Sequence, residues 1–280
     1  MAVFRIVGWV DRWTAMLALL TLLTLLSPAM AQDPPALLGP PADSIPEGPI
    51  GDAIRLGEKI MTQTPIFATQ YSGNALNCTS CHLDGGRRPY ASPLVGIWGV
   101  FPEYRSRSGG VQGLQDRIND CFERSMNGRA LPFDSDEMHG LLAYMQWLSK
   151  GVPTGQDGPG RGFQRIRSLQ PPDPERGKQI YADKCAACHG PEGQGVYGAR
   201  GETLYPPLWG PRSFNIGAGL ARVNTAAAFV KSNMPLAQGG TLTEQEAFDV
   251  AAYFTHEPRP DFAGKDRDWP KGGKPKDARY

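Results

Sequence analysis

Apolar residues recur at helical spacing near the end of each half of the chain. In residues 243–257, Thr243 and Glu246 form a capping box, and the apolar positions that follow are three or four residues apart: Ala247, Val250, Ala251 and Phe254. Residues 136–149 show a similar pattern. We find no convincing run in which apolar and polar residues alternate as they do in a strand. The patterning therefore predicts an all-α fold.

The two halves also share an order of segments. A predicted helix, residues 55–65 in the first half and 175–184 in the second, precedes a Cys-x-x-Cys-His motif, "CTSCH" at 78–82 and "CAACH" at 185–189. A long loop region and the closing helix follow each motif. This internal repeat predicts two domains of the same construction.

Each Cys-x-x-Cys-His motif has the residues needed to attach a c-type haem. Two thiols on one turn can add to the porphyrin vinyl groups while the adjacent imidazole reaches the iron. The copies stand 107 residues apart, whereas paired zinc motifs are usually about 15–20 residues apart, and the βαβ setting of a thioredoxin-like motif is missing. We therefore expect two covalent haem c groups, with thioethers and proximal ligands at Cys78, Cys81, Cys185, Cys188, His82 and His189.

The segments that flank the motifs resemble class I cytochrome c domains. The resemblance implies two tandem domains of this class, each binding one haem c. In that fold a glycine on the N-terminal helix permits close crossing by an aromatic residue on the C-terminal helix. The fitting pairs are Gly57 with Tyr144 and Gly177 with Tyr253, although each pair taken alone is equally compatible with a surface glycine and a core tyrosine.

The N-terminus has the features of a signal peptide. Arg5 and Arg12 are followed by a 13-residue apolar run, Thr14–Leu26, and then by small residues at Ala29 and Ala31. The run is shorter than the roughly 20 residues that span a bilayer, so an uncleaved anchor is the weaker interpretation. We expect cleavage after Ala31, export to the periplasm and no stable membrane anchor.

Cleavage at that point would remove two of the 29 basic and one of the 28 acidic residues, leaving a formal net charge of zero. This balance gives no support for a nucleic-acid partner. Composition further predicts an N-terminal domain at 32–155, a linker rich in Pro and Gly at 156–172, a C-terminal domain at 173–256 and a tail at 257–280. We expect the tail to wrap the surface or to stay mobile.

An electron-transfer haem needs a second axial ligand, usually histidine or methionine. In the second half the candidate is Met234, which precedes a proline and lies 45 residues after His189, shortly before the last helix. The alternative is that Met234 only fills the core. Lys231 is a further candidate ligand, although a solvated lysine is the simpler interpretation of it.

The fifth cysteine, Cys121, has no partner among the motif cysteines. It falls 39 residues after His82 on one face of a predicted helix, with Leu114, Ile118, Phe122 and Ser125, and Asn127-Gly128 would end that helix. Three interpretations stay open: an inert buried thiol, half of an intermolecular disulfide, or a thiolate ligand to iron. Met126 is a rival ligand at 44 residues from His82, and Arg117 and Arg124 can flank the thiol.

Residues 93–110, "PLVGIWGVFPEYRSRSGG", and 114–132, "LQDRINDCFERSMNGRALP", closely resemble the dihaem thiosulfate dehydrogenases, also called tetrathionate synthases. The resemblance extends through both domains. It implies an active-site haem with His/Cys ligation in the first domain and a second haem that passes electrons on. By position, Cys121 would be the distal ligand and catalytic sulfur, and Met234 the second distal ligand. Some relatives exchange that methionine with a lysine directly before it, where this chain has Asn233.

The implied reaction joins two thiosulfate dianions into tetrathionate and removes two electrons. A cationic pocket would offset the repulsion between the dianions, and the candidates for it are Arg107 and Arg124, with Ser125 as a hydrogen-bond donor and Arg105 and Arg117 as further candidates. The simpler interpretation of each arginine is an exposed side chain in a surface ion pair. As a hypothesis, Cys121 carries a covalent S-sulfonated persulfide that a second thiosulfate attacks.

Two alternatives use many of the same residues. A plain dihaem electron-transfer cytochrome would need neither the arginines nor a reactive Cys121. An enzyme acting mainly as a tetrathionate reductase would use the same residues in the opposite direction. In each case the family implies a small periplasmic electron carrier, such as a soluble cytochrome c, as partner.

Overall fold

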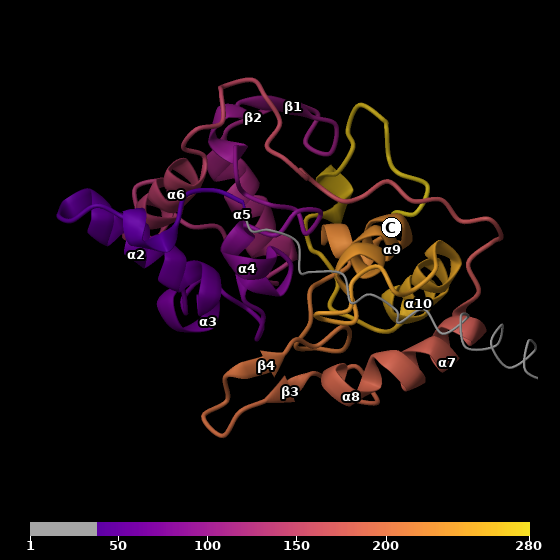
Figure 1. Ribbon diagram of the computed structural model, residues 1–280. Coiled ribbons are helices and arrows are strands. Elements are labelled where there is room, and N and C mark those ends of the chain that lie inside the picture. Colours follow the sequence, from indigo (N-terminus) through magenta and orange to yellow (C-terminus); the bar gives the residue numbers. More distant parts are fainter. Residues whose placement is uncertain (1–37) are drawn as a thin grey trace, which may run out of the picture. The chain divides into compact units, whose positions relative to one another are not determined.

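The structure is a computed structural model that describes residues 38–280. The expected signal peptide and its cleavage after Ala31 therefore lie outside the described residues. Figure 1 shows a chain built mainly from helices, with two short hairpins. In the part of the chain that the structure describes, no helix has both the length and the apolar character needed to cross a bilayer.

From residue 38 onward, the first half contains five helices: α2 (Pro49–Thr62), α3 (Thr64–Phe67), α4 (Leu83–Gly86), α5 (Leu114–Arg124) and α6 (Asp136–Leu148). Helix α2 packs against α6. At their crossing, a side chain on Gly57 would place its first carbon 2.1 Å from the Gly140 carbonyl oxygen and 2.7 Å from Tyr144 Cβ. These separations are far inside van der Waals contact, so only glycine fits. The expected pairing of Gly57 with Tyr144 is confirmed.

The second half repeats this arrangement with α7 (Pro174–Lys184), α8 (Ala186–His189), α9 (Val223–Asn233) and α10 (Glu244–His256). Helix α10 packs against α7 and α9. A first side-chain carbon on Gly177 would lie 2.0 Å from the Asp249 carbonyl oxygen and 2.9 Å from Tyr253 Cβ, which confirms the second pairing. Helix α9 occupies part of the region expected to be loop.

Helix ends follow the local sequence. Thr243 Oγ1 accepts a hydrogen bond from the Glu246 backbone N–H at 3.1 Å, and Glu246 accepts one from Thr243 N at 2.7 Å, so the predicted capping box starts α10. Helix α5 ends at Arg124, three residues before Asn127, whose φ of 47° then turns the chain away. Single 3-10 turns lie at Ala42–Ser44, Cys78–Ser80, Ile97–Gly99, Gly219–Ala221 and Lys265–Arg267.

Two short antiparallel hairpins accompany the helices of the predicted all-α fold. In the first, β1 (Glu103–Arg105) pairs with β2 (Gly110–Gln112); in the second, β3 (Val196–Tyr197) pairs with β4 (Thr203–Tyr205). Strands of two or three residues are too short to show an alternating pattern. The turn between β1 and β2 carries Arg107, so this hairpin helps to build the site described below.

Each half has its own hydrophobic cluster, but one segment of the second half crosses into the first. Phe214, Ala218 and Ala221 belong to the core of the first half. The buried Asn215 side chain donates to the Glu123 carbonyl at 2.8 Å and to Asn127 Oδ1 at 3.1 Å. Residues 213–222, which we call the crossing segment, are therefore fixed against the end of α5.

The C-terminal tail packs against the rest of the protein. Phe262 is 7% exposed and Trp269 is 8% exposed, and the Trp269 N–H donates to the Arg107 carbonyl at 2.7 Å. Asp277 accepts from the Asn224 N–H at the start of α9 at 2.9 Å. In Figure 1 this yellow segment passes between the β1–β2 hairpin and α9. Few of its residues are apolar, and polar contacts supply much of its attachment.

Candidate active site and haem sites

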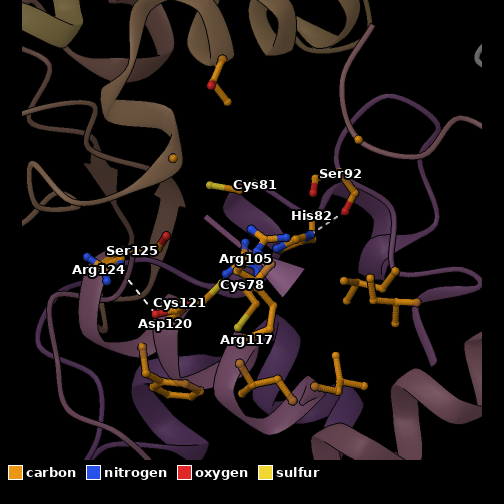
Figure 2. A pocket seen from close by; sticks show the side chains of 18 of the residues that line it. Cys78, Cys81, His82, Ser92, Arg105, Arg117, Asp120, Cys121, Arg124 and Ser125 are labelled. Atoms are coloured by element: carbon orange, nitrogen blue, oxygen red, sulfur yellow. Dashed lines mark hydrogen bonds and ion pairs between the residues drawn. The ribbon is translucent and has the colours of Figure 1, made fainter. Parts of the chain in front are cut away.

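A cavity of about 570 Å³ lies in the first half. Its wall includes both cysteines and the histidine of the first motif, Cys78, Cys81 and His82, together with Cys121 from α5. Figure 2 shows these side chains directed into the same space, with Arg105 and Arg117 among them. The structure thus brings together the first motif and the unpaired cysteine, which are 39 residues apart in sequence.

A second cavity, of about 280 Å³, contains the other motif. It is lined by Cys185, Cys188 and His189, and Met234 also lines it. Lys231 lies elsewhere: its ammonium group donates to the carbonyls of Gly240 at 2.8 Å and Leu242 at 2.5 Å. These bonds account for Lys231 without an iron-ligand role.

Both motifs present their histidine in the form that haem iron requires. His82 Nδ1 lies 2.6 Å from the Ser92 carbonyl oxygen, and His189 Nδ1 lies 2.8 Å from that of Pro206. A carbonyl oxygen can only accept, so Nδ1 carries the proton and Nε2 is left with a free lone pair. Ligand pockets usually measure about 300–1,000 Å³, and the two cavities lie within or just below that range. Two thiols, one such imidazole and a cavity fit one covalent haem c at each motif.

Cys121 differs from the motif cysteines in its electrostatic surroundings. Burial disfavours its thiolate, but Arg117, which donates to the sulfur at 2.9 Å, and the nearby His82 outweigh burial and lower the pKa of Cys121 to about 7. Burial instead raises the pKa of Cys78 to about 11 and that of Cys81 to about 12. Of these three thiols, Cys121 is therefore the one prepared to react or bind as a thiolate.

The rival candidate Met126 faces the same cavity but is 3% exposed and belongs to the hydrophobic core of the first half. Its thioether carries no charge, so the charged groups that surround Cys121 would not stabilise it as they stabilise a thiolate. Ser125 also lines the cavity, one turn along from Cys121 and next to Arg124 (Figure 2). The remaining histidines, His139 and His256, are exposed and line neither cavity.

Arg107 and Arg124 both reach the cavity, and neither forms the simple surface ion pair considered above. Arg124 donates to both carboxylate oxygens of Asp268, at 2.9 Å each, and Arg107 Nε lies 3.7 Å from the same carboxylate. The Asp268 side chain is 4% exposed, and the Tyr280 hydroxyl donates to it. Asp268, 144 residues from Arg124, was missed by sequence reasoning, because no local pattern signals so distant a partner.

The other charged groups of the cavity form a second set. Arg105 donates to Glu103 at 2.6 Å, and Arg161, from the linker, lies 3.6 Å from the same carboxylate. Arg222, from the second half, also lines the cavity. Burial lowers the pKa of Arg107, and the positive charges of Arg124 and Arg222 act in the same direction. The site is therefore a concave surface crowded with guanidinium groups, beside a cysteine and a haem motif.

Comparisons with known proteins match both halves of the chain. The family model described as "SoxA/TsdA, cytochrome c domain" matches residues 64–154, and the model "Cytochrome c" matches residues 174–256. A thiosulfate dehydrogenase of Psychrobacter arcticus is 46% identical over 249 residues, which cover 89% of this chain and 76% of that protein. The chain belongs to the thiosulfate dehydrogenase family. Its two matched cytochrome c domains are all-α units with one covalent haem c each.

Other members of the family extend the similarity. The thiosulfate dehydrogenase of Allochromatium vinosum is 45% identical over 240 residues, covering 84% of this chain and 89% of that protein. A solved structure of the thiosulfate dehydrogenase (TsdBA) of Marichromatium purpuratum, in its as-isolated form, is 42% identical with a TM-score of 0.77. That alignment covers 80% of this chain, which spans about half the length of the solved one, 49%.

Proposed function

We propose that this protein is a periplasmic thiosulfate dehydrogenase, which joins two thiosulfate ions into tetrathionate and passes the two electrons to a small acceptor such as a soluble cytochrome c. The observation that carries the proposal is Cys121, held by Arg117 at 2.9 Å in an arginine-lined cavity that also contains the first haem motif. An inert core thiol would not need a guanidinium donor, and an electron carrier would not need an anion-binding cavity at its haem.

Each residue then has a task. His82 and Cys121 would hold the iron at the first haem site, and His189 and Met234 would hold it at the second. When bound, each haem c takes up and hands on one electron at a time. Arg117 keeps Cys121 as a thiolate. Arg107 and Arg124 offset the charge of the substrate, and Ser125 donates a hydrogen bond to it.

The covalent chemistry takes place on Cys121. Its thiolate sulfur forms an S–S bond with the sulfane sulfur of one thiosulfate, and two electrons leave, which gives an S-sulfonated persulfide. The sulfane sulfur of a second thiosulfate attacks the outer sulfur of this adduct. The bond to Cys121 breaks, the thiolate is regenerated, and tetrathionate departs. Arginines around the site lower the repulsion between the two anions in this second step.

We propose the domain division that goes with these roles. Residues 32–155 form the domain with the active-site haem, residues 156–172 the linker, residues 173–256 the electron-transfer domain, and residues 257–280 the tail. Cleavage after Ala31 would deliver the chain to the periplasm. The matched ranges 64–154 and 174–256 support the division.

The test is to add thiosulfate to the oxidised holoprotein, to follow haem reduction by its absorption, and to detect tetrathionate. We expect rapid reduction in the wild type and none in Cys121→Gly, which should still carry both haems. The matched control is Met126→Leu, which changes the rival sulfur of the same cavity and should retain turnover. A plain electron-transfer cytochrome would not be reduced by thiosulfate, and turnover by Cys121→Gly would exclude the proposed chemistry.

A further inference from the structure

The six arginines that line the first cavity differ in what neutralises them. Four have a carboxylate oxygen at 3.7 Å or less: Arg105, Arg107, Arg124 and Arg161. Arg117 instead donates to the Cys121 sulfur. Among residues 38–280, Arg222 has neither an ion pair nor a side-chain hydrogen bond, and its Nε is buried without a partner. This guanidinium is therefore the positive charge in the cavity wall that still lacks a counter-ion.

The fold holds Arg222 in place from both sides. It ends the crossing segment, whose Ala218 and Ala221 are 2% and 0% exposed in the core of the first half. It also stands at the N-terminal end of α9, and the next turn of that helix adds Thr225 to the cavity wall. The second half of the chain thus places the positive charge of Arg222 in the wall of the first cavity, on backbone that is fixed on both sides.

Arg222 is half-buried, and a guanidinium whose buried Nε has no partner is costly, so its presence in the cavity wall indicates that an anionic substrate binds there. Tetrathionate carries a sulfonate at each end, and its formation requires two thiosulfate dianions in the cavity at once. One of them bonds to Cys121, beside Arg117, Arg124 and Ser125. For the second, Arg222 is the cation of the wall whose charge no carboxylate of the described residues offsets.

We propose that Arg222, assisted by Thr225, forms the binding site for the second thiosulfate. This inference rests on the proposed function. In this position Arg222 holds the sulfonate group of the incoming thiosulfate. The sulfane sulfur of that ion attacks the outer sulfur of the Cys121 adduct. A new S–S bond forms, the bond to Cys121 breaks, and the cysteine leaves as a thiolate with the electron pair. No oxidant takes part in this step.

The experiment compares the holoprotein with Arg222→Met, which keeps the length of the side chain and removes its charge. The matched control is Arg212→Met, because Arg212 is an exposed arginine of the same half that stacks on Tyr197 and lines neither cavity. Loss of a charge-assisted hydrogen bond predicts a KM for thiosulfate about 10- to 100-fold higher in Arg222→Met, and unchanged in the control. Haem spectra confirm that both haems are attached.

A single-turnover measurement separates the two thiosulfate sites. With one equivalent of thiosulfate, Arg222→Met should still reduce both haems by one electron each and show the Cys121 adduct by mass spectrometry. A second addition should clear that adduct at least about ten-fold more slowly than in the wild type. Clearance at the wild-type rate would overturn the proposal. Failure to form the adduct would overturn it too, because Arg222 would then serve the first thiosulfate.

Calorimetric titration of tetrathionate into the oxidised holoprotein tests the site without turnover. Affinity should fall by a similar factor in Arg222→Met and not in Arg212→Met. If the wild type fails to oxidise thiosulfate but this difference remains, the proposed function fails and the anion site stands. Equal affinities would reject the site while leaving the function intact. Should Arg222→Met lose a haem, Arg222→Gln carries the same expectations.

Discussion

Replacing Asp268 by asparagine should loosen the C-terminal tail and lower the stability of the protein. The carboxylate binds Arg124 through two 2.9 Å hydrogen bonds, lies 3.7 Å from Arg107, and accepts from Tyr280. The Asp268 and Arg124 side chains are 4% and 11% exposed, so water cannot replace the lost charge. Breaking one partner of a buried ion pair typically costs about 3–5 kcal/mol, because the other charge is left uncompensated.

The assay is thermal denaturation of the holoprotein, followed by far-ultraviolet circular dichroism. For a protein of this size about 3–5 kcal/mol corresponds to a fall in Tm of about 6–20 °C. The matched control is Asp261→Asn in the same tail, where the carboxylate pairs with Lys265 in solvent and should leave the midpoint unchanged. If Asp268→Asn unfolds at the wild-type midpoint, the tail is not held by this cluster and the reasoning is refuted.

Three further substitutions test other parts of the account. Arg117→Met removes the donor to Cys121 and should slow thiosulfate turnover about 10- to 100-fold with both haems attached, measured by steady-state kinetics; an unchanged rate would contradict its role. Gly57→Ala should cost at least about 1–3 kcal/mol of stability in denaturation, since its methyl would meet the Gly140 carbonyl, whereas Gly110→Ala, in open space, should not; equal stabilities would argue against the tight crossing. Met234→Leu should alter the spectrum of the second haem while thiosulfate still reduces the first; identical spectra would remove Met234 as a ligand.

The repeated framework of the fold could be predicted because its signals are local. The two motifs, the capping box at Thr243 and the apolar spacing of the closing helices each lie within a few residues. The glycine–tyrosine pairs needed the class I cytochrome c resemblance, since nothing near Gly57 in sequence indicates that α6 will cross it. The short hairpins were missed because two or three residues are too few to show an alternating pattern. Helix α9 was missed because it lies within a stretch expected to be a long loop.

The cavity itself was only partly predictable. The helical face of α5 placed Cys121, and the resemblance supplied roles for Arg107, Arg124 and Ser125. Their neutralising partner Asp268 and the unpaired Arg222 come from the tail and from the other domain. Such long-range pairings depend on how the halves pack, and a pattern confined to one segment carries no information about that packing.

The central claim is tested most directly by identifying the axial ligand of the first haem. Electron paramagnetic resonance of the oxidised holoprotein makes that identification. The account predicts a low-spin signal typical of a thiolate ligand in the wild type, lost in Cys121→Gly, while the signal of the second haem persists. A wild-type spectrum without thiolate character, or one that Cys121→Gly leaves unchanged, would contradict the claim that this sulfur works at the iron.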